Sequence, residues 1–130
     1  MAGSRLMAMP TLQDVSISLR NLRRAWPEQW PGLPLVFDRA WAQLGLATPR
    51  KGSSAHSLLA FGRLVAEQVE QDGIRRHAQG LEPAYHNRLH IADTLVCMTY
   101  LLKTSALLDV PGARKPGVAA MALAIMTGHD

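Results

Sequence analysis

The residues of this sequence best suited to chemistry are histidines and carboxylates gathered in two short segments. His86, His90 and Asp93 lie close together, and His129 and Asp130 follow an uncharged apolar run at 118–126. Burying imidazoles and a carboxylate costs free energy unless each group has a partner. The pattern therefore predicts either a hydrogen-bonded polar network or a metal site. A set of nitrogen and oxygen ligands suits zinc, manganese, iron or, with more oxygens, magnesium.

The first of these segments opens a predicted helix over about 89–109 that is apolar on nearly every side. Such a helix is typical of the middle of a bundle. His90 and Asp93 are three residues apart and share one face of it. If the helical path begins early enough, His86 lies one turn before His90 on the same side.

The remaining elements needed to position these groups are also predicted to be helices, because no long stretch alternates apolar and polar residues, as a strand would. Thr11 is a plausible cap for the first, Pro34 suits the first position of the second, and Ser53 or Ser54 could cap the third. Apolar spacing, with Gly and Pro as breakers, predicts the helices 11–25, 34–46, 55–78, 89–109 and 116–128. We expect one all-α domain, a multi-helix bundle, with an N-terminal segment 1–50 and motif-bearing helices over 53–130.

Other conspicuous residues have structural interpretations. Trp26, Trp30 and Trp41 are expected to form a packing cluster. Cys97 is interpreted as a small buried hydrophobe. Arg88 is close enough to the histidines to meet a phosphate, but a surface position is equally compatible with the sequence. Further polar residues are expected to be solvent-exposed, namely His56, His77, Arg20, Arg23 and Arg24.

Length and composition limit the classes of protein to which the chain can belong. With 130 residues, 48% of them hydrophobic, the chain suits one globular domain. The single cysteine excludes an intramolecular disulfide and a cysteine-based zinc cluster. No signal peptide or membrane-length apolar stretch is visible, so we expect a cytoplasmic protein. The net charge of +4 comes from scattered residues and does not favour nucleic acid as a partner.

The two segments together resemble a known family. Tyr85, His86, Asn87, His90 and Asp93, followed by an apolar helix ending in His129-Asp130, are similar to the motifs of class I cyclic nucleotide phosphodiesterases. These enzymes belong to the HD-domain metal-dependent phosphohydrolases. The similarity covers the C-terminal third of the chain and implies the N-terminal part of such a helical domain.

The resemblance implies a role for each motif residue. His86 matches the histidine that protonates the leaving oxygen. His90, His129 and Asp130 match metal ligands, and Tyr85, Asn87 and Asp93 match residues that support the site. The implied cofactors are divalent metal ions, Zn, Mg or Mn, which clamp the phosphate and stabilise its developing charge. The implied substrate is a cyclic nucleotide or another phosphate ester.

The chain also departs from the family pattern. Ile91 replaces the small alanine that commonly follows the ligand histidine. The sequence stops at Asp130, whereas the family has a further metal-binding aspartate and a nucleotide pocket downstream. We therefore expect an incomplete phosphohydrolase domain with poor activity. The alternative is a non-catalytic helical interaction module with a vestigial metal site, which could form homo-oligomers through an uncovered apolar helix face.

Overall fold

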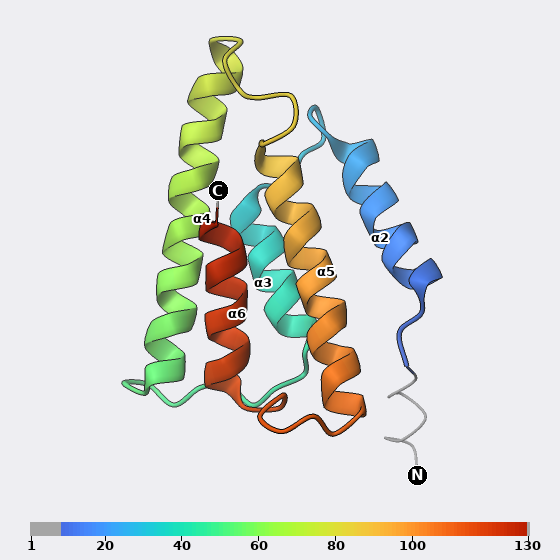
Figure 1. Ribbon diagram of the computed structural model, residues 1–130. Helices are drawn as coiled ribbons and strands as arrows, with labels where there is room; N and C mark the ends of the chain where they lie inside the picture. Colours follow the sequence, from blue (N-terminus) through green and yellow to red (C-terminus); the bar gives the residue numbers. More distant parts are fainter. Residues whose placement is uncertain (1–8, 130) are drawn as a thin grey trace.

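The computed structural model describes residues 9–129, which form five α-helices and no strand (Figure 1). The prediction of an all-α fold is confirmed. The helices are α2 (Leu12–Ala25), α3 (Leu33–Gln43), α4 (Ser54–Ala78), α5 (Arg88–Leu107) and α6 (Pro116–Gly128). Asp130 lies outside the described residues. Among those described, no helix is both long and apolar enough to cross a membrane.

The helix ends follow from local sequence. Thr11 caps α2 in a reciprocal arrangement, in which its hydroxyl accepts from the Asp14 backbone and the Asp14 carboxylate accepts from the Thr11 backbone. Ser53 caps α4 in the same general manner. The second helix was predicted over 34–46 but runs from Leu33 to Gln43. Gly32, with a φ of 99°, makes the turn into it and leaves Pro34 in its first turn.

The core lies between α3, α4, α5 and α6. In Figure 1, α6 lies in front of α3 and is flanked by α4 and α5. Gly62 on α4 allows this close packing, because a Cβ there would lie 2.7 Å from the ring of Phe37 and 3.1 Å from Ala124. The fully or nearly buried core side chains are Leu33, Val36, Phe37, Ala40, Ala66, Ile91, Ala92, Leu95 and Leu123.

Helix α2 is attached differently from the others. It contacts α5 and no other described helix, and none of its residues is buried. One polar link, between the hydroxyls of Ser18 and Tyr100 at 2.9 Å, joins it to the middle of α5. The N-terminal helix therefore lies along one side of the bundle (Figure 1).

Two expectations about single residues have different outcomes. The rings of Trp26 and Trp30 meet edge to face at 5.0 Å, and Trp30 and Trp41 both pack against the core. Among the described residues no ring contact joins Trp41 to the other two, so the expected cluster holds for Trp26 and Trp30. Cys97 was expected to be buried, but it is exposed. The apolar residues on all sides of α5 exceed what its neighbours can cover, so the position of Cys97 falls on an uncovered face.

Candidate metal centre

The candidate site begins where the connector after α4 enters α5. Asn87 caps α5, because its side-chain oxygen accepts from the His90 backbone N–H at 3.0 Å. Its amide group donates to the carbonyl of Ala84 at 3.2 Å. The helix thus starts at Arg88, and His86 lies in the connector instead of one helical turn before His90. The expectation of a continuous helical path through His86 is wrong.

The rings of three histidines nevertheless gather at this end of the bundle. His86 and His90 have ring centroids 5.5 Å apart and nearly perpendicular, and His90 and His129 are also separated by 5.5 Å. Tyr85 is adjacent to both His86, at 4.8 Å, and His90, at 5.5 Å. A connector, the first turn of α5 and the end of α6 therefore contribute one imidazole each. His129 is distant in sequence from the other two, and the fold brings it close to His90.

The end of α6 lies against α4. A Cβ at Gly128 would make an ordinary van der Waals contact with Val65, at 3.5 Å. Beyond it, His129 Nδ1 lies 2.5 Å from the carbonyl oxygen of Met126. A carbonyl can only accept, so Nδ1 carries the proton, and neutral His129 keeps its lone pair on Nε2. This is the orientation that a carbonyl partner imposes on many metal-binding histidines.

Asp93 provides the carboxylate of the cluster. Its side chain is 23% exposed, and Oδ2 lies 3.6 Å from the guanidinium of Arg23 on α2. Oδ1 is buried and has no hydrogen-bond partner among the described residues. Burial raises the pKa of Asp93 above its ordinary value, although the charges of Arg23 and His90 act in the opposite direction. The fold therefore holds a carboxylate whose charge is only partly compensated.

These residues fit a divalent ion in their chemistry, although residues 9–129 contain no complete cluster of three ligands. Two imidazoles bound to one ion through nitrogens about 2.1 Å away have ring centroids roughly 5 to 5.5 Å apart. His90 and His129 have that spacing. Asp93 lies three residues after His90 on α5, and its Oδ1 has no hydrogen-bond partner among the described residues. The predicted third ligand, Asp130, lies outside the described residues.

A second polar cluster adjoins the site, and sequence reasoning missed it. Arg88 is only 6% exposed, so neither a phosphate contact nor a surface position describes it. Its Nη1 donates to Glu70 at 2.5 Å, and its Nε and Nη2 donate to the two carboxylate oxygens of Glu82 at 2.7 and 2.9 Å. Its guanidinium carbon also lies 5.0 Å from the Trp26 ring centroid.

Both acidic partners of Arg88 are held by further contacts. Glu70 Oε1 accepts from the indole N–H of Trp30 and from the Leu33 backbone. His77 Nδ1 lies 3.3 Å from Glu82, so this exposed histidine belongs to the cluster. Burial would raise the pKa of Glu82, but the hydrogen bonds and charge of Arg88 outweigh it and lower that pKa. The hydrogen bonds that Arg88 donates to Glu82 in turn raise the pKa of Arg88.

The glycine opposite Arg88 is the signal that could have revealed this cluster. Gly73 lies within the long helix α4, where glycine is unfavourable, and a Cβ there would overlap the Arg88 side chain. An unexplained mid-helix glycine indicates the close approach of another group. Of the other polar predictions, His56 is exposed as expected. Arg23 is 70% exposed and still lies beside Asp93.

The chain was compared with models of protein families, with curated proteins and with solved structures. None of the three comparisons finds a match. The geometry of the cluster, together with its sequence motif, is therefore the basis for assigning a function.

Proposed function

We propose that the chain carries part of the metal centre of a phosphohydrolase similar to 3′,5′-cyclic nucleotide phosphodiesterases. The observation that carries the proposal is the 5.5 Å approach of the His90 and His129 rings from two separate helices. The Nε2 lone pair of His129 and the unpaired Oδ1 of Asp93 support it. His90 and His129 would hold the ion, with Asp130 as the ligand that the sequence adds.

The bound ion would supply the positive charge that polarises a phosphate ester and stabilises its transition state. The chain's own residues would orient that ester and move a proton. His86 is exposed and lies in the connector before the Asn87 cap, with its ring centroid 5.5 Å from that of His90. An imidazole there would hold a proton at one ring nitrogen and donate it to the departing sugar oxygen. Tyr85 packs edge to face on His86 and would limit its rotation.

Metal binding is the primary test. Isothermal titration of metal-free protein with zinc, and separately with manganese, should show saturable binding that His90→Ala weakens by at least about 10-fold. His56→Ala is the matched control, because this exposed histidine lies in the first turn of α4. Equal affinity in the parent protein and His90→Ala would contradict the assignment, as would the absence of binding.

The proton-donor role of His86 needs a separate test. The assay follows the hydrolysis of cyclic AMP, cyclic GMP and bis(4-nitrophenyl) phosphate. We expect His86→Ala to lower the rate on the cyclic nucleotides by about 100-fold or more while metal affinity is unchanged. The rate on bis(4-nitrophenyl) phosphate should fall less, because its leaving group needs no proton. A uniform loss on all three esters, or no loss, would contradict this role.

A second candidate function, a helical interaction module that self-associates, is favoured by the surface of α6. Val118, Met121 and Ile125 follow one another at helical spacing and are each about half exposed. Phe61 and Leu64 are exposed on the neighbouring α4. Light scattering should then detect a dimer that Ile125→Lys dissociates. A monomer at high concentration would exclude this candidate without affecting the metal-binding test.

A further inference from the structure

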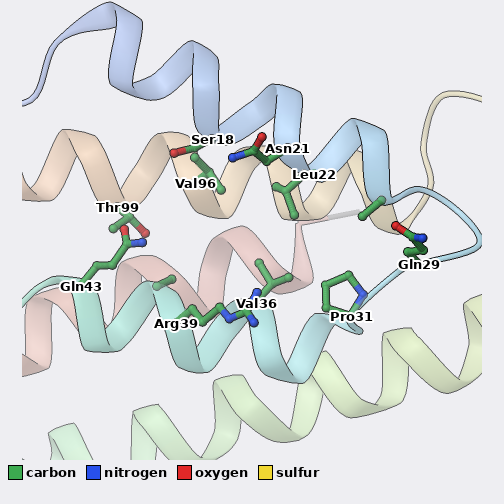
Figure 2. A pocket seen from close by; sticks show the side chains of 12 residues that line it. Ser18, Asn21, Leu22, Gln29, Pro31, Val36, Arg39, Gln43, Val96 and Thr99 are labelled. Atoms are coloured by element: carbon green, nitrogen blue, oxygen red, sulfur yellow. The ribbon is translucent and has the colours of Figure 1, made fainter.

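A cavity on the other side of α5 is separate from the histidine cluster. It has a volume of about 450 Å³ and lies between α2, α3 and α5 (Figure 2). None of the candidate site residues lines it. Its volume is within the range of small-molecule sites, which are typically 300–1,000 Å³.

The lining is divided evenly between apolar residues and residues with hydrogen-bonding side chains. Leu22, Val36 and Val96 supply apolar surface from α2, α3 and α5 respectively. Figure 2 shows Ser18 and Asn21 on the α2 side of the cavity, and Gln43 of α3 close to Thr99 of α5. Apolar surface together with hydrogen-bonding groups is what a site for an amphipathic organic molecule requires.

The electrostatics of the lining favour an anion. Arg39 is its one charged residue, and no acidic side chain lines the cavity. Within the part of the chain that the structure describes, no ion pair engages Arg39, whereas its neighbour Asp38 is paired with Arg63 at 3.1 Å. A guanidinium without a carboxylate partner is suited to bidentate binding of a carboxylate or phosphate.

Two polar groups at the inner wall can also bind a ligand. Thr99 is only 1% exposed, and its hydroxyl donates to the Leu95 carbonyl at 2.8 Å. That bond uses the hydroxyl proton and leaves oxygen lone pairs able to accept. The Gln43 amide beside it can donate and accept. A ligand with an amide-like or hydroxyl edge would therefore find partners at Gln43, one turn after Arg39 on α3, and at Thr99 of α5.

Because α2 is loosely attached to the bundle, it is suited to act as a cover that packs more tightly when a ligand binds. This helix contacts α5 alone and buries none of its own residues, yet it forms one wall of the cavity. A molecule in contact with both Leu22 and Val36 would add packing between α2 and α3, whose backbones do not approach each other closely. Binding would therefore add packing where the bundle has least.

We infer that the α2–α3–α5 cavity is a binding site for a small organic anion, an apolar body carrying one carboxylate or phosphate that pairs with Arg39. The inference does not depend on the proposed phosphohydrolase function. Its site, ligand and test involve neither a metal nor turnover.

The test uses 2-naphthoate as the probe and neutral 2-naphthamide as its isosteric comparison. Titration of the ¹⁵N-labelled full chain should shift the backbone amide signals of Ser18, Val36, Arg39 and Thr99. A ligand of about 13 non-hydrogen atoms should bind with a Kd of roughly 1 mM, and the amide about 10-fold more weakly. Hydrogen exchange in α2 should slow by about 10-fold at a probe concentration near ten times Kd.

Variants of the chain distinguish a specific binding site from nonspecific attraction of the anionic probe to a basic protein. Arg39→Gln should reduce naphthoate affinity about 10-fold, to that of the amide. Arg50→Gln removes one exposed charge outside the cavity and should change nothing. Ala25→Trp, at the cavity rim, should abolish binding of both molecules while the circular dichroism spectrum stays that of the parent. Absence of saturable shifts at these four residues would overturn the inference, and so would equal losses in Arg39→Gln and Arg50→Gln.

Discussion

Two charged clusters at the same end of α5 differ in how completely their members are paired. Arg88 donates to two carboxylates and lies over an indole ring, and the second oxygen of Glu70 is satisfied as well. Asp93, on the same helix, has one exposed arginine at 3.6 Å and a buried oxygen without a partner among residues 9–129. Both clusters bury charge, but only the first compensates it within the described fold.

The two clusters are expected to affect the stability of the fold in opposite directions. A buried ion pair with its hydrogen bonds complete fixes geometry, and here it ties α5 to α4, to the connector and to the loop before α3. A buried carboxylate whose hydrogen bonds are incomplete lowers stability. We therefore expect substitutions in the Arg88 cluster to damage the fold, and substitutions at Asp93 to relieve it.

The largest effect is expected for Arg88→Ala, which leaves Glu70 and Glu82 buried without their cation. Removing one partner of a buried pair costs about 3–5 kcal/mol. Urea denaturation should show this loss in the free energy of unfolding. The matched control is Arg75→Ala, because Arg75 pairs with Asp72 on the surface, where such a pair contributes about 0–1 kcal/mol. Similar losses in the two variants would mean that the Arg88 cluster is no more than a surface feature.

Gly73→Ala should have the next largest effect. A methyl group at this position would overlap Cδ and Nε of Arg88 and displace the guanidinium from its carboxylates. We expect a loss of about 1–3 kcal/mol. Gly117→Ala is the control, because a Cβ at this helical glycine meets nothing within 4 Å and should stabilise α6 by up to about 1 kcal/mol. Thermal denaturation should therefore shift in opposite directions, and a shared direction would refute the close-approach explanation.

Asp93→Asn should stabilise the protein at neutral pH by roughly 1 kcal/mol, because it removes a poorly compensated charge. The folded state raises the pKa of Asp93, so the folded chain holds this proton more tightly than the unfolded chain. The ionised carboxylate therefore destabilises the fold above its raised pKa, and this cost disappears as the pH falls below the ordinary value of 3.8.

Melting temperatures of the parent and Asp93→Asn, measured from pH 3 to pH 8, should diverge as the pH rises. Asp38→Asn provides the comparison, since Asp38 is exposed and paired with Arg63. A stability loss in Asp93→Asn at neutral pH would show that Asp93 is compensated by a group outside residues 9–129, and the contrast between the clusters would disappear.

The sequence predicted the helices well because caps and breakers act locally. Thr11, Ser53 and Pro116 stand at or next to the ends of their helices, as their side chains favour. The approach of His90 to His129 was expected only from a family resemblance, since no local rule places two distant helix ends together. His86 was placed one helical turn before His90, and this placement was wrong. Asn87 caps the first turn of α5, so the residues before it lie outside the helix.

The Arg88 cluster was beyond local reasoning for a different reason. Its partners come from α4 and the following connector, and whether an arginine is buried depends on carboxylates that the sequence does not place beside it. Gly73 was a usable signal, but only as the mark of a close approach by an unidentified group. The α2–α3–α5 cavity was also beyond local reasoning, because its shape depends on the angle between α2 and the rest of the bundle.

The smallest expected effect is that of Arg23→Gln. The Arg23 side chain is 70% exposed, and at 3.6 Å from Asp93 it makes a loose, solvated pair. Such a pair contributes about 0.2–0.5 kcal/mol, which added salt reduces further. A double-mutant cycle with Asp93→Asn, read by urea denaturation at low and high salt, isolates this coupling. A coupling near that of Arg88 with Glu82 would mean that Arg23 fully compensates Asp93. A small, salt-sensitive coupling would show that Arg23 leaves the charge of Asp93 largely uncompensated within residues 9–129.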